Sequence, residues 1–277
     1  MLRAKHIRNA VDGNGTLLMG DVYNVGVNDL LGSDSQRYWE VSTIQKYSLG
    51  ARFITGDGRV FKYAKAGGTL IPDTGCGSYD VQHIAFSAIA AVAAIGVKTI
   101  SITAGATCGA AADGVIAKNE LVGGYVVFFT ASAATCQRRL ILSNTAVAAG
   151  GGTLIITIDD PIHIALTTSD HAECMASPYH NVQNGADISK PIVGVPVCVA
   201  TVGQYCWIQT WGPCWVAPQA TVGASGHNQV VFRHDGSLDD HDYSEVYATY
   251  AQHAGFVLSS AAAGAQAAPF IMLQISI

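Results

Sequence analysis

The chain has 277 residues, of which 49% are hydrophobic and only 13% are charged, and its formal net charge is −5. This length suffices for one large or two ordinary domains, so folding requires no metal or disulfide staple. The 15 Lys and Arg residues form no basic cluster, so we expect no nucleic-acid partner. Because typical soluble domains contain roughly 25% charged residues, we expect much of the surface to be neutral or covered by protein partners.

Residues 1–47 contain scattered turn signals and few periodic apolar positions. We expect an extended N-terminal arm that becomes ordered across a neighbouring subunit, because such a segment alone buries too little surface to offset its chain entropy. Tyr38 and Trp39 are its candidate interface anchors. The N-terminus shows no apolar core followed by a small-residue cleavage site, so we expect synthesis and assembly in the cytoplasm.

Residues 48–70 predict a β-hairpin. Gly56, Asp57 and Gly58 form a turn signal between two β-rich runs, and Asp-Gly tolerates the positive φ of hairpin connections. The longest apolar run, 84–97, is shorter than the ~20 residues that span a bilayer. We therefore interpret it as a buried or interfacial segment and expect no membrane partner.

A compact β-unit is predicted between residues 96 and 166. Short runs alternate between apolar and polar residues, as in Ile100 and Ile102 against Ser101, which is typical of strands with one buried face. The glycine pairs at 123–124 and 151–152 indicate strand entries or bulges. No phosphate-binding glycine pattern occurs, and no cofactor is expected.

Residues 167–191 are polar and predict a connection between two β-rich domains, 48–166 and 192–277. At least five further strands follow, and we expect the C-terminal domain to pack with 48–83. The fold class is therefore all-β, built of β-sandwich or β-tulip-like modules with an extended N-terminal arm.

Three tryptophans lie close together in the C-terminal domain. In the run QYCWIQTW, Trp207 and Trp211 share one face of a strand, and Trp215 follows. This aromatic face covers either a core or an interface, and the sequence leaves both open.

The seven cysteines have an odd count and no CxxC spacing, which favours free thiols over a disulfide framework. One alternative remains open. Cys206 and Cys214 flank Gly212 and Pro213, and could pair across a hairpin turn at those residues.

Candidate chemistry is sparse. The segment His234–Asp242 is rich in His and Asp, which predicts a solvated turn, with a weak calcium site or a catalytic metal site as alternatives. Asp159 and Asp160 are adjacent at a strand end and would point to opposite faces, which argues against a glycosidase pair. The run 137–139 carries two arginines and predicts a solvated or interface face. We assign no catalytic, cofactor-binding or metal-binding residue.

Six stretches of the chain resemble virion structural proteins of tailed bacteriophages. They are LGARFITGDGRVFKYAKAG, NELVGGYVVFFTASAATCQRRLILSNTA, TLIITIDDPI, ASPYHNV, VGVPVCVATVGQYCWIQTWG and AGFVLSSAAAGAQAAPFIML. The closing stretch is similar to capsid decoration, or cement, proteins. The resemblance covers roughly residues 48–277 and implies β-sandwich or β-tulip modules, often trimeric, that reinforce the capsid lattice. This chain is about twice the usual size of the small decoration proteins, which leaves room for a second, exposed domain.

The resemblance implies a non-enzymatic head decoration protein on the capsid surface. Its expected partners are the major capsid protein and itself, as a homotrimer. A tail or fibre component is the alternative, followed by a carbohydrate-active tail enzyme. The candidate interface residues are Tyr38, Trp39, Trp207, Trp211 and Trp215.

Overall fold

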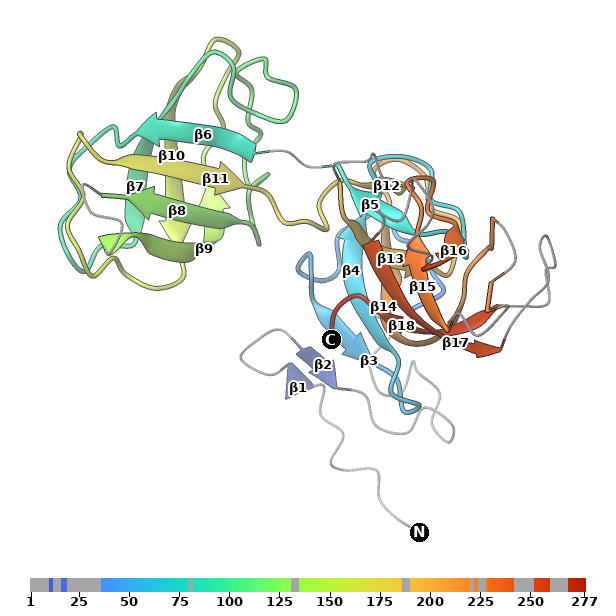
Figure 1. The fold of residues 1–277 in the computed structure, drawn as a ribbon. Helices are drawn as coiled ribbons and strands as arrows, with labels where there is room; N and C mark the ends of the chain where they lie inside the picture. Colours follow the sequence, from blue (N-terminus) through green and yellow to red (C-terminus); the bar gives the residue numbers. More distant parts are fainter. Residues whose placement is uncertain are drawn as a thin grey trace. The chain divides into compact units, whose positions relative to one another are not determined.

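The computed structural model describes residues 10–11, 16–18, 36–79, 82–130, 135–185, 190–219, 222–223, 228–241, 252–259 and 269–277. Over these residues the regular elements are β-strands, which confirms the predicted all-β class (Figure 1). No helix in this described part of the chain is long and apolar enough to cross a membrane.

The chain forms two compact units. Unit 1 comprises Met1–Tyr79 and Asn181–Ile277, and unit 2 comprises Asp80–His180. Unit 2 is thus inserted into unit 1. The hairpin before residue 79 and the strands after residue 181 belong to one unit, in line with the expectation that the C-terminal domain packs with 48–83. The boundaries differ from those expected, because the inserted unit is 80–180 rather than part of a domain 48–166.

The expected connection at 167–191 contains two strands, β11 (His171–Met175) and β12 (Val182–Asn184). β11 lies inside the sheet of unit 2, between β6 and β8. Its polar residues occupy the partly exposed side of the strand while Ala172 and Cys174 are buried. The polarity that predicted a loop therefore belongs to a strand with one exposed face.

Unit 2 is one curled antiparallel sheet in the order β6-β11-β8-β9-β10-β7. A bridge between Ile89 and Ile102 joins the two ends of this order, so the sheet closes around an aliphatic core. The four strands predicted between 96 and 166 are confirmed. The strands other than β11 are β6 (Gln82–Ala88), β7 (Thr99–Ala104), β8 (Tyr125–Phe129), β9 (Gln137–Asn144) and β10 (Gly152–Ile158).

A glycine begins the approach to β10, as the sequence predicts for the pair 151–152. Gly151 has a φ of +91°, and a Cβ built on it would lie 2.4 Å from the carbonyl oxygen of Ala104. Any larger residue would therefore push β10 away from β7 at the point where they start to pair.

Unit 1 contains a larger sheet in the order β1-β2-β3-β4-β14-β18-β17-β15-β16, with β13, β5 and β12 attached through β14. The long strand β14 pairs with β4 along its first half and with β18 along its second half. The elements of unit 1 other than β12 are β1 (Ala10–Val11), β2 (Thr16–Leu18), β3 (Arg52–Ile54), β4 (Val60–Lys65), β5 (Cys76–Ser78), β13 (Ile192–Pro196), β14 (Tyr205–Trp215), β15 (Gln229–Phe232), β16 (Leu238–Asp240), β17 (Gln252–Ser259) and β18 (Phe270–Gln274).

The described parts of the predicted N-terminal arm belong to unit 1. β2 pairs in parallel with β3, and the segment 36–47 packs on an aromatic cluster formed by Phe53, Phe61, Tyr63 and Trp207. Most of residues 1–35 lies outside the described residues. Residues 36–47 are thus part of their own chain's core packing, which differs from the arm expected from the sequence.

The predicted hairpin turn at Gly212 and Pro213 is wrong, because β14 runs through both residues without reversing. Cys206 and Cys214 are eight positions apart on this one strand, which separates them by roughly 26 Å. A disulfide needs a Cα separation of about 4–7 Å, so these two cysteines cannot pair. All seven cysteines are free thiols in the structure.

Candidate interaction surfaces

The Trp39 surface of unit 1 consists of Arg37, Tyr38, Trp39 and Arg59. The Tyr38 and Trp39 rings meet edge to face with centroids 4.5 Å apart, and the Arg37 guanidinium lies 5.4 Å from the Trp39 ring. Trp39 is 43% exposed. Aromatic rings and arginines are the residue types that dominate binding energy at protein interfaces.

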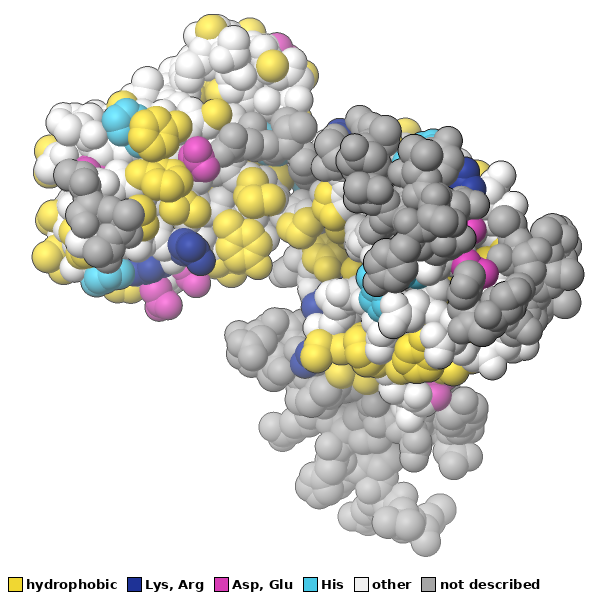
Figure 2. Space-filling model, viewed as in Figure 1, with side chains coloured by type: hydrophobic (Ala, Val, Ile, Leu, Met, Phe, Trp, Pro, Cys, Tyr) yellow, Lys and Arg dark blue, Asp and Glu magenta, His cyan; other side chains and the backbone are white. Residues whose placement is uncertain are grey.

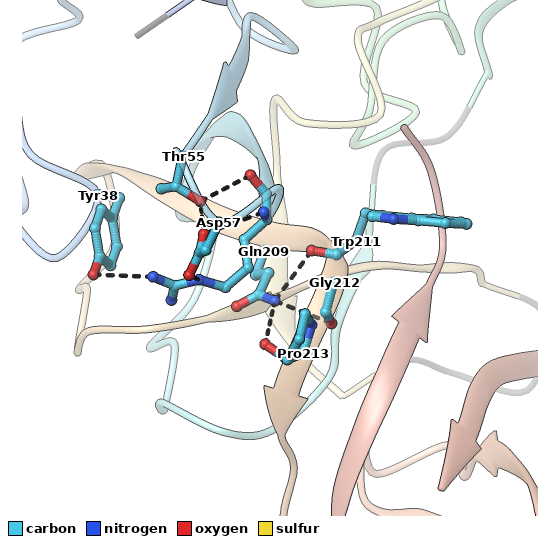
Figure 3. Close-up of polar contacts among 8 residues, drawn as sticks. Tyr38, Thr55, Asp57, Gln209, Trp211, Gly212 and Pro213 are labelled. Carbon is cyan, nitrogen blue, oxygen red and sulfur yellow. Dashed lines mark hydrogen bonds and ion pairs between the residues drawn. The ribbon is translucent and has the colours of Figure 1, made fainter. Parts of the chain in front are cut away.

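Arg59 is fixed at this surface by two neighbours, Asp57 and Tyr38 (Figure 3). Its Nε donates to Asp57 Oδ2 at 2.8 Å, and one terminal nitrogen reaches the Tyr38 hydroxyl at 3.5 Å. The guanidinium also lies 5.2 Å from the Tyr38 ring. Burial opposes ionisation of Asp57, but hydrogen bonds from Thr55 and the charge of Arg59 outweigh it and hold the Asp57 pKa below its ordinary value.

Arg59 packs against the backbone of β14 at Gly212. Gly212 has a φ of +97°, and a Cβ there would lie 2.9 Å from Cγ of Arg59. The buried Gln209 donates to three successive carbonyl oxygens, those of Trp211, Gly212 and Pro213 (Figure 3). The unusual backbone at Gly212 therefore leaves the space in which Arg59 lies, and Gln209 holds that backbone in place.

Gln36 anchors the Trp39 surface to the core. Its side chain accepts a hydrogen bond from Tyr63 Oη at 2.7 Å and donates to the carbonyl oxygens of Glu40 and Tyr205, each at 2.8 Å. The Trp207 indole nitrogen donates to the Gln36 carbonyl oxygen at 3.2 Å. A buried polar group with this many partners fixes the segment that carries Tyr38 and Trp39.

The candidate interface tryptophans differ in their surroundings. Trp207 is only 1% exposed and lies within the aromatic cluster, so its assignment as an interface anchor is wrong, because its ring packs in the core of its own chain. Trp211 and Trp215 are half-buried. Nε1 of Trp215 is buried without a hydrogen-bond partner among the described residues. Only Tyr38 and Trp39 meet at one exposed surface.

Unit 2 presents a second surface, the outer side of the β6-β11-β8-β9 sheet, which we call the unit 2 face. Residues directly opposite each other on antiparallel strands share one side of the sheet, so the strand register arranges this face in rows. Figure 2 shows hydrophobic side chains spread over it, with acidic and basic groups between them. Its side chains are those of Phe86, Tyr125, Val127, Phe129, Arg138, Leu140, His171, Glu173 and Met175.

Phe86 has an unusual backbone on this face. Its φ is +39°, and the register of β6 against β11 shifts at the same place. The shift is a bulge, which redirects the Phe86 ring onto the His171 ring, with centroids 4.3 Å apart and planes within 8°. The ring remains 56% exposed. Backbone strain at a bulky residue costs free energy and is typical of functional positions.

The buried His83, at the start of β6, forms a polar pair with the half-buried Glu120. His83 Nε2 lies 3.2 Å from Glu120 Oε1, and the other oxygen of Glu120 accepts from the Ala117 nitrogen at 2.5 Å. Burial opposes ionisation of Glu120, but the bonds from His83 and Ala117 outweigh it and lower the pKa of this carboxyl. The sequence analysis missed this pair, because the two residues are far apart in the chain and match no motif.

Of the predicted turn at 234–242, residues 234–237 lie in the loop of the hairpin formed by β15 and β16, and 238–240 belong to β16. Ser237 donates from its backbone nitrogen to Asp235 Oδ1 at 2.9 Å, and Arg233 pairs with Asp239 at 3.0 Å. Asp242 lies outside the described residues. No group of three or more His, Cys, Asp or Glu in the described ranges could hold a metal ion.

The two remaining sequence candidates, Asp159 with Asp160 and the run 137–139, form hydrogen bonds within unit 2. Asp159 follows the end of β10 and accepts a hydrogen bond from the Leu140 nitrogen at 3.1 Å. Gln137 is buried, and its side-chain oxygen accepts from the His163 nitrogen at 2.8 Å, so only Arg138 of the run 137–139 is largely exposed.

Comparison with known proteins gives no match: no family model, no curated protein and no solved structure is significantly similar to this chain.

Proposed function

We propose that this chain is a non-enzymatic structural protein of a tailed-phage virion that binds the capsid lattice and reinforces it as a head decoration protein. The phage assignment rests on the sequence resemblance described above. The geometry of the Trp39 surface supports a binding role, because an exposed Trp, a stacked Tyr and two arginines are held on a rigid support.

The composition supports the same proposal. Charged residues are only 13% of the chain, and large hydrophobic side chains are exposed on both units, including Ile44 and Val202 on unit 1 and Val92 on unit 2. Exposed apolar surface beyond a few hundred Å² is typical of proteins that assemble with partners. The proposed partners are the major capsid protein and two further copies of this chain in a trimer, with the protein on the capsid surface of particles assembled in the host cytoplasm.

The proposal is tested by imaging purified particles and by measuring binding of the isolated protein to heads that lack it. We expect density on the head surface, and we expect Trp39→Ala to weaken binding at least 10-fold. Phe256→Ala is the matched control, because Phe256 is 39% exposed and lies on β17, which contributes no residue to the Trp39 surface. Density on the tail would instead favour a tail or fibre component. Equal binding by both variants would show that the Trp39 surface is not the contact.

A further inference from the structure

We propose that the unit 2 face binds a second copy of this chain around a two-fold axis that runs parallel to β8 and passes over Val127. The inference requires only the geometry of unit 2 and is independent of the proposed virion role. It rests on the order of charges and apolar residues across three adjacent strands.

Three residues form the central row of the face. Glu173 on β11 lies opposite Val127 on β8, and Val127 lies opposite Arg138 on β9. Neighbouring strands are about 4.8 Å apart, so the acidic and basic positions are separated by about 10 Å with the valine midway. Neither Glu173 nor Arg138 forms an ion pair with another described residue.

The next row is apolar. Met175 lies opposite Tyr125, and Tyr125 lies opposite Leu140. Tyr125 is 50% exposed and Met175 is 45% exposed. On the other side of the charged row, Phe129 lies opposite His171, which carries the stacked Phe86 ring. The charges are thus flanked by apolar groups that gain free energy when they leave water.

A two-fold axis along β8 makes this pattern complementary to itself. This rotation places β11 of the second copy over β9 of the first, and β9 over β11, while each row of residues stays at the same height along the strands. Glu173 therefore faces Arg138 of the second copy, and Arg138 faces Glu173 of the second copy. The same operation places Met175 against Leu140 of the second copy, and Tyr125 and Phe129 against their own equivalents. In an isologous contact each pair occurs twice, so one arrangement yields two charge pairs.

The charges also exclude the other in-plane arrangement. A two-fold axis across the strands would place Glu173 against Glu173 and Arg138 against Arg138, and like charges at an interface are strongly unfavourable. Aligned packing of two sheets at a distance of about 10 Å is an ordinary geometry for β-proteins, which fits the axis along β8. The pattern therefore specifies both the partner and its orientation.

The size of the face sets the expected strength. Four strands and five residues cover about 19 by 17 Å, well below the ~800 Å² per partner of a standard stable interface. Interfaces of standard size reach dissociation constants from micromolar to picomolar, so we expect this smaller face to bind weakly in solution, with a dissociation constant on the order of 10 μM. In an array of copies fixed on a lattice, such contacts would act together and strengthen one another.

Charge exchange tests the proposal. We would measure the weight-average mass of the full chain by sedimentation between about 1 and 100 μM, concentrations that bracket this dissociation constant. The proteins are the wild type, Glu173→Arg, Arg138→Glu and an equal mixture of the two variants. Lys118→Glu is the control, because it changes charge as Arg138→Glu does at an exposed position outside the face.

We expect the mass of the wild type and of the control to rise with concentration. Each single variant places like charges in both pairs and should associate at least 10-fold more weakly. The mixture should regain association, because the two basic positions of one variant then face the two acidic positions of the other, and this recovery also shows that both variants are folded. The proposal fails if the wild type shows no concentration dependence, if the single variants match it, or if mixing restores nothing. A trimer formed through unit 1 would persist in all these proteins and is thereby distinguished.

Discussion

The two units build their cores from different material. Unit 2 is a continuous segment whose core consists almost entirely of aliphatic side chains inside one curled sheet. Unit 1 is assembled from two separate segments, and one of its clusters is aromatic, with the buried Gln36 bonded into it. All four tryptophans, at 39, 207, 211 and 215, belong to unit 1.

The two units also show which strand pairings depend on local sequence and which depend on contacts between distant segments. In unit 2, β8 pairs with β9 and β9 pairs with β10 across short connections, so period-2 alternation and turn residues specify the register of these pairs. The pairs β6-β11, β11-β8 and β10-β7 join strands that are distant in the sequence. In unit 1, β4 pairs with β14 across the whole inserted unit. A polar residue such as Gln36 therefore has a structural role there that no local pattern reveals.

The largest effect is expected from Trp207→Ala. Trp207 is the largest fully buried side chain, and its removal should cost about 3–5 kcal/mol of the stability of unit 1. Urea unfolding monitored by the remaining tryptophans measures this loss. Trp39→Ala should cost only about 1 kcal/mol, because that ring is partly exposed. Equal losses would contradict the distinction between core and surface.

Phe128→Ala is the corresponding change in unit 2. Phe128 is fully buried in the aliphatic core, so we expect a loss of about 3–5 kcal/mol confined to unit 2. Calorimetry should show one transition lowered, while tryptophan fluorescence, which reports only on unit 1, keeps its midpoint. If both transitions move by the same amount, the two units unfold as one cooperative body.

Gln36→Leu tests the polar contact that distinguishes unit 1. It leaves the buried Tyr63 hydroxyl and two carbonyl oxygens without the Gln36 side chain, which should cost about 2–3 kcal/mol. Gln45→Leu, at an exposed position, is the control and should change stability little. For the same reason, deletion of 1–47 should destabilise unit 1, whereas the arm expected from the sequence, ordered only across a neighbouring subunit, could be removed without unfolding the rest of the chain. An unchanged unfolding midpoint in Gln36→Leu would instead support the interpretation of 1–47 as an arm outside the core of unit 1.

Acid should weaken unit 2 through Glu120. Its pKa in the folded chain is below the ordinary value of 4.5, so its ionised form stabilises unit 2 fully above about pH 4.5 and this contribution disappears as the pH falls through the folded pKa. We expect Glu120→Gln to flatten the decrease in the melting temperature of unit 2 between about pH 6 and 3. Asp160→Asn, at an exposed position, is the control. An unchanged slope in Glu120→Gln would rule out the pair with His83 as its cause.

The smallest difference between the units concerns their thiols. Five cysteines are buried, and burial raises the pKa of Cys206 and Cys214 to about 12. We expect a thiol reagent at neutral pH to modify the native protein only at the half-buried Cys136 and Cys198, one in each unit, and all seven cysteines after denaturation. Peptide mapping of the modified protein identifies the sites. Rapid labelling of Cys206 would mean that β14 opens readily.

Much of unit 2 follows from the sequence itself. Alternation over residues 99–104 and 152–158 predicts two of its strands, and the glycine before β10 predicts the strand entry. The hairpin of β3 and β4 also follows from its turn, where Gly58 has a φ of +85°. These features are local, because side-chain period and turn chemistry depend on residues only a few positions apart.

Only the tertiary structure determines the rest. β14 is buried on both sides along most of its length. Its sequence therefore carries no alternation of apolar and polar residues that would distinguish the buried Trp207 from the half-buried Trp211. The rows on the unit 2 face require β11, which the sequence analysis took for a loop, beside β8 and β9. The sequence by itself determined the strands that have clear alternation or turn signals, such as β7 and β10; the pairing of distant strands decided which side chains meet, because long-range register depends on the burial of the whole sheet rather than on any one segment.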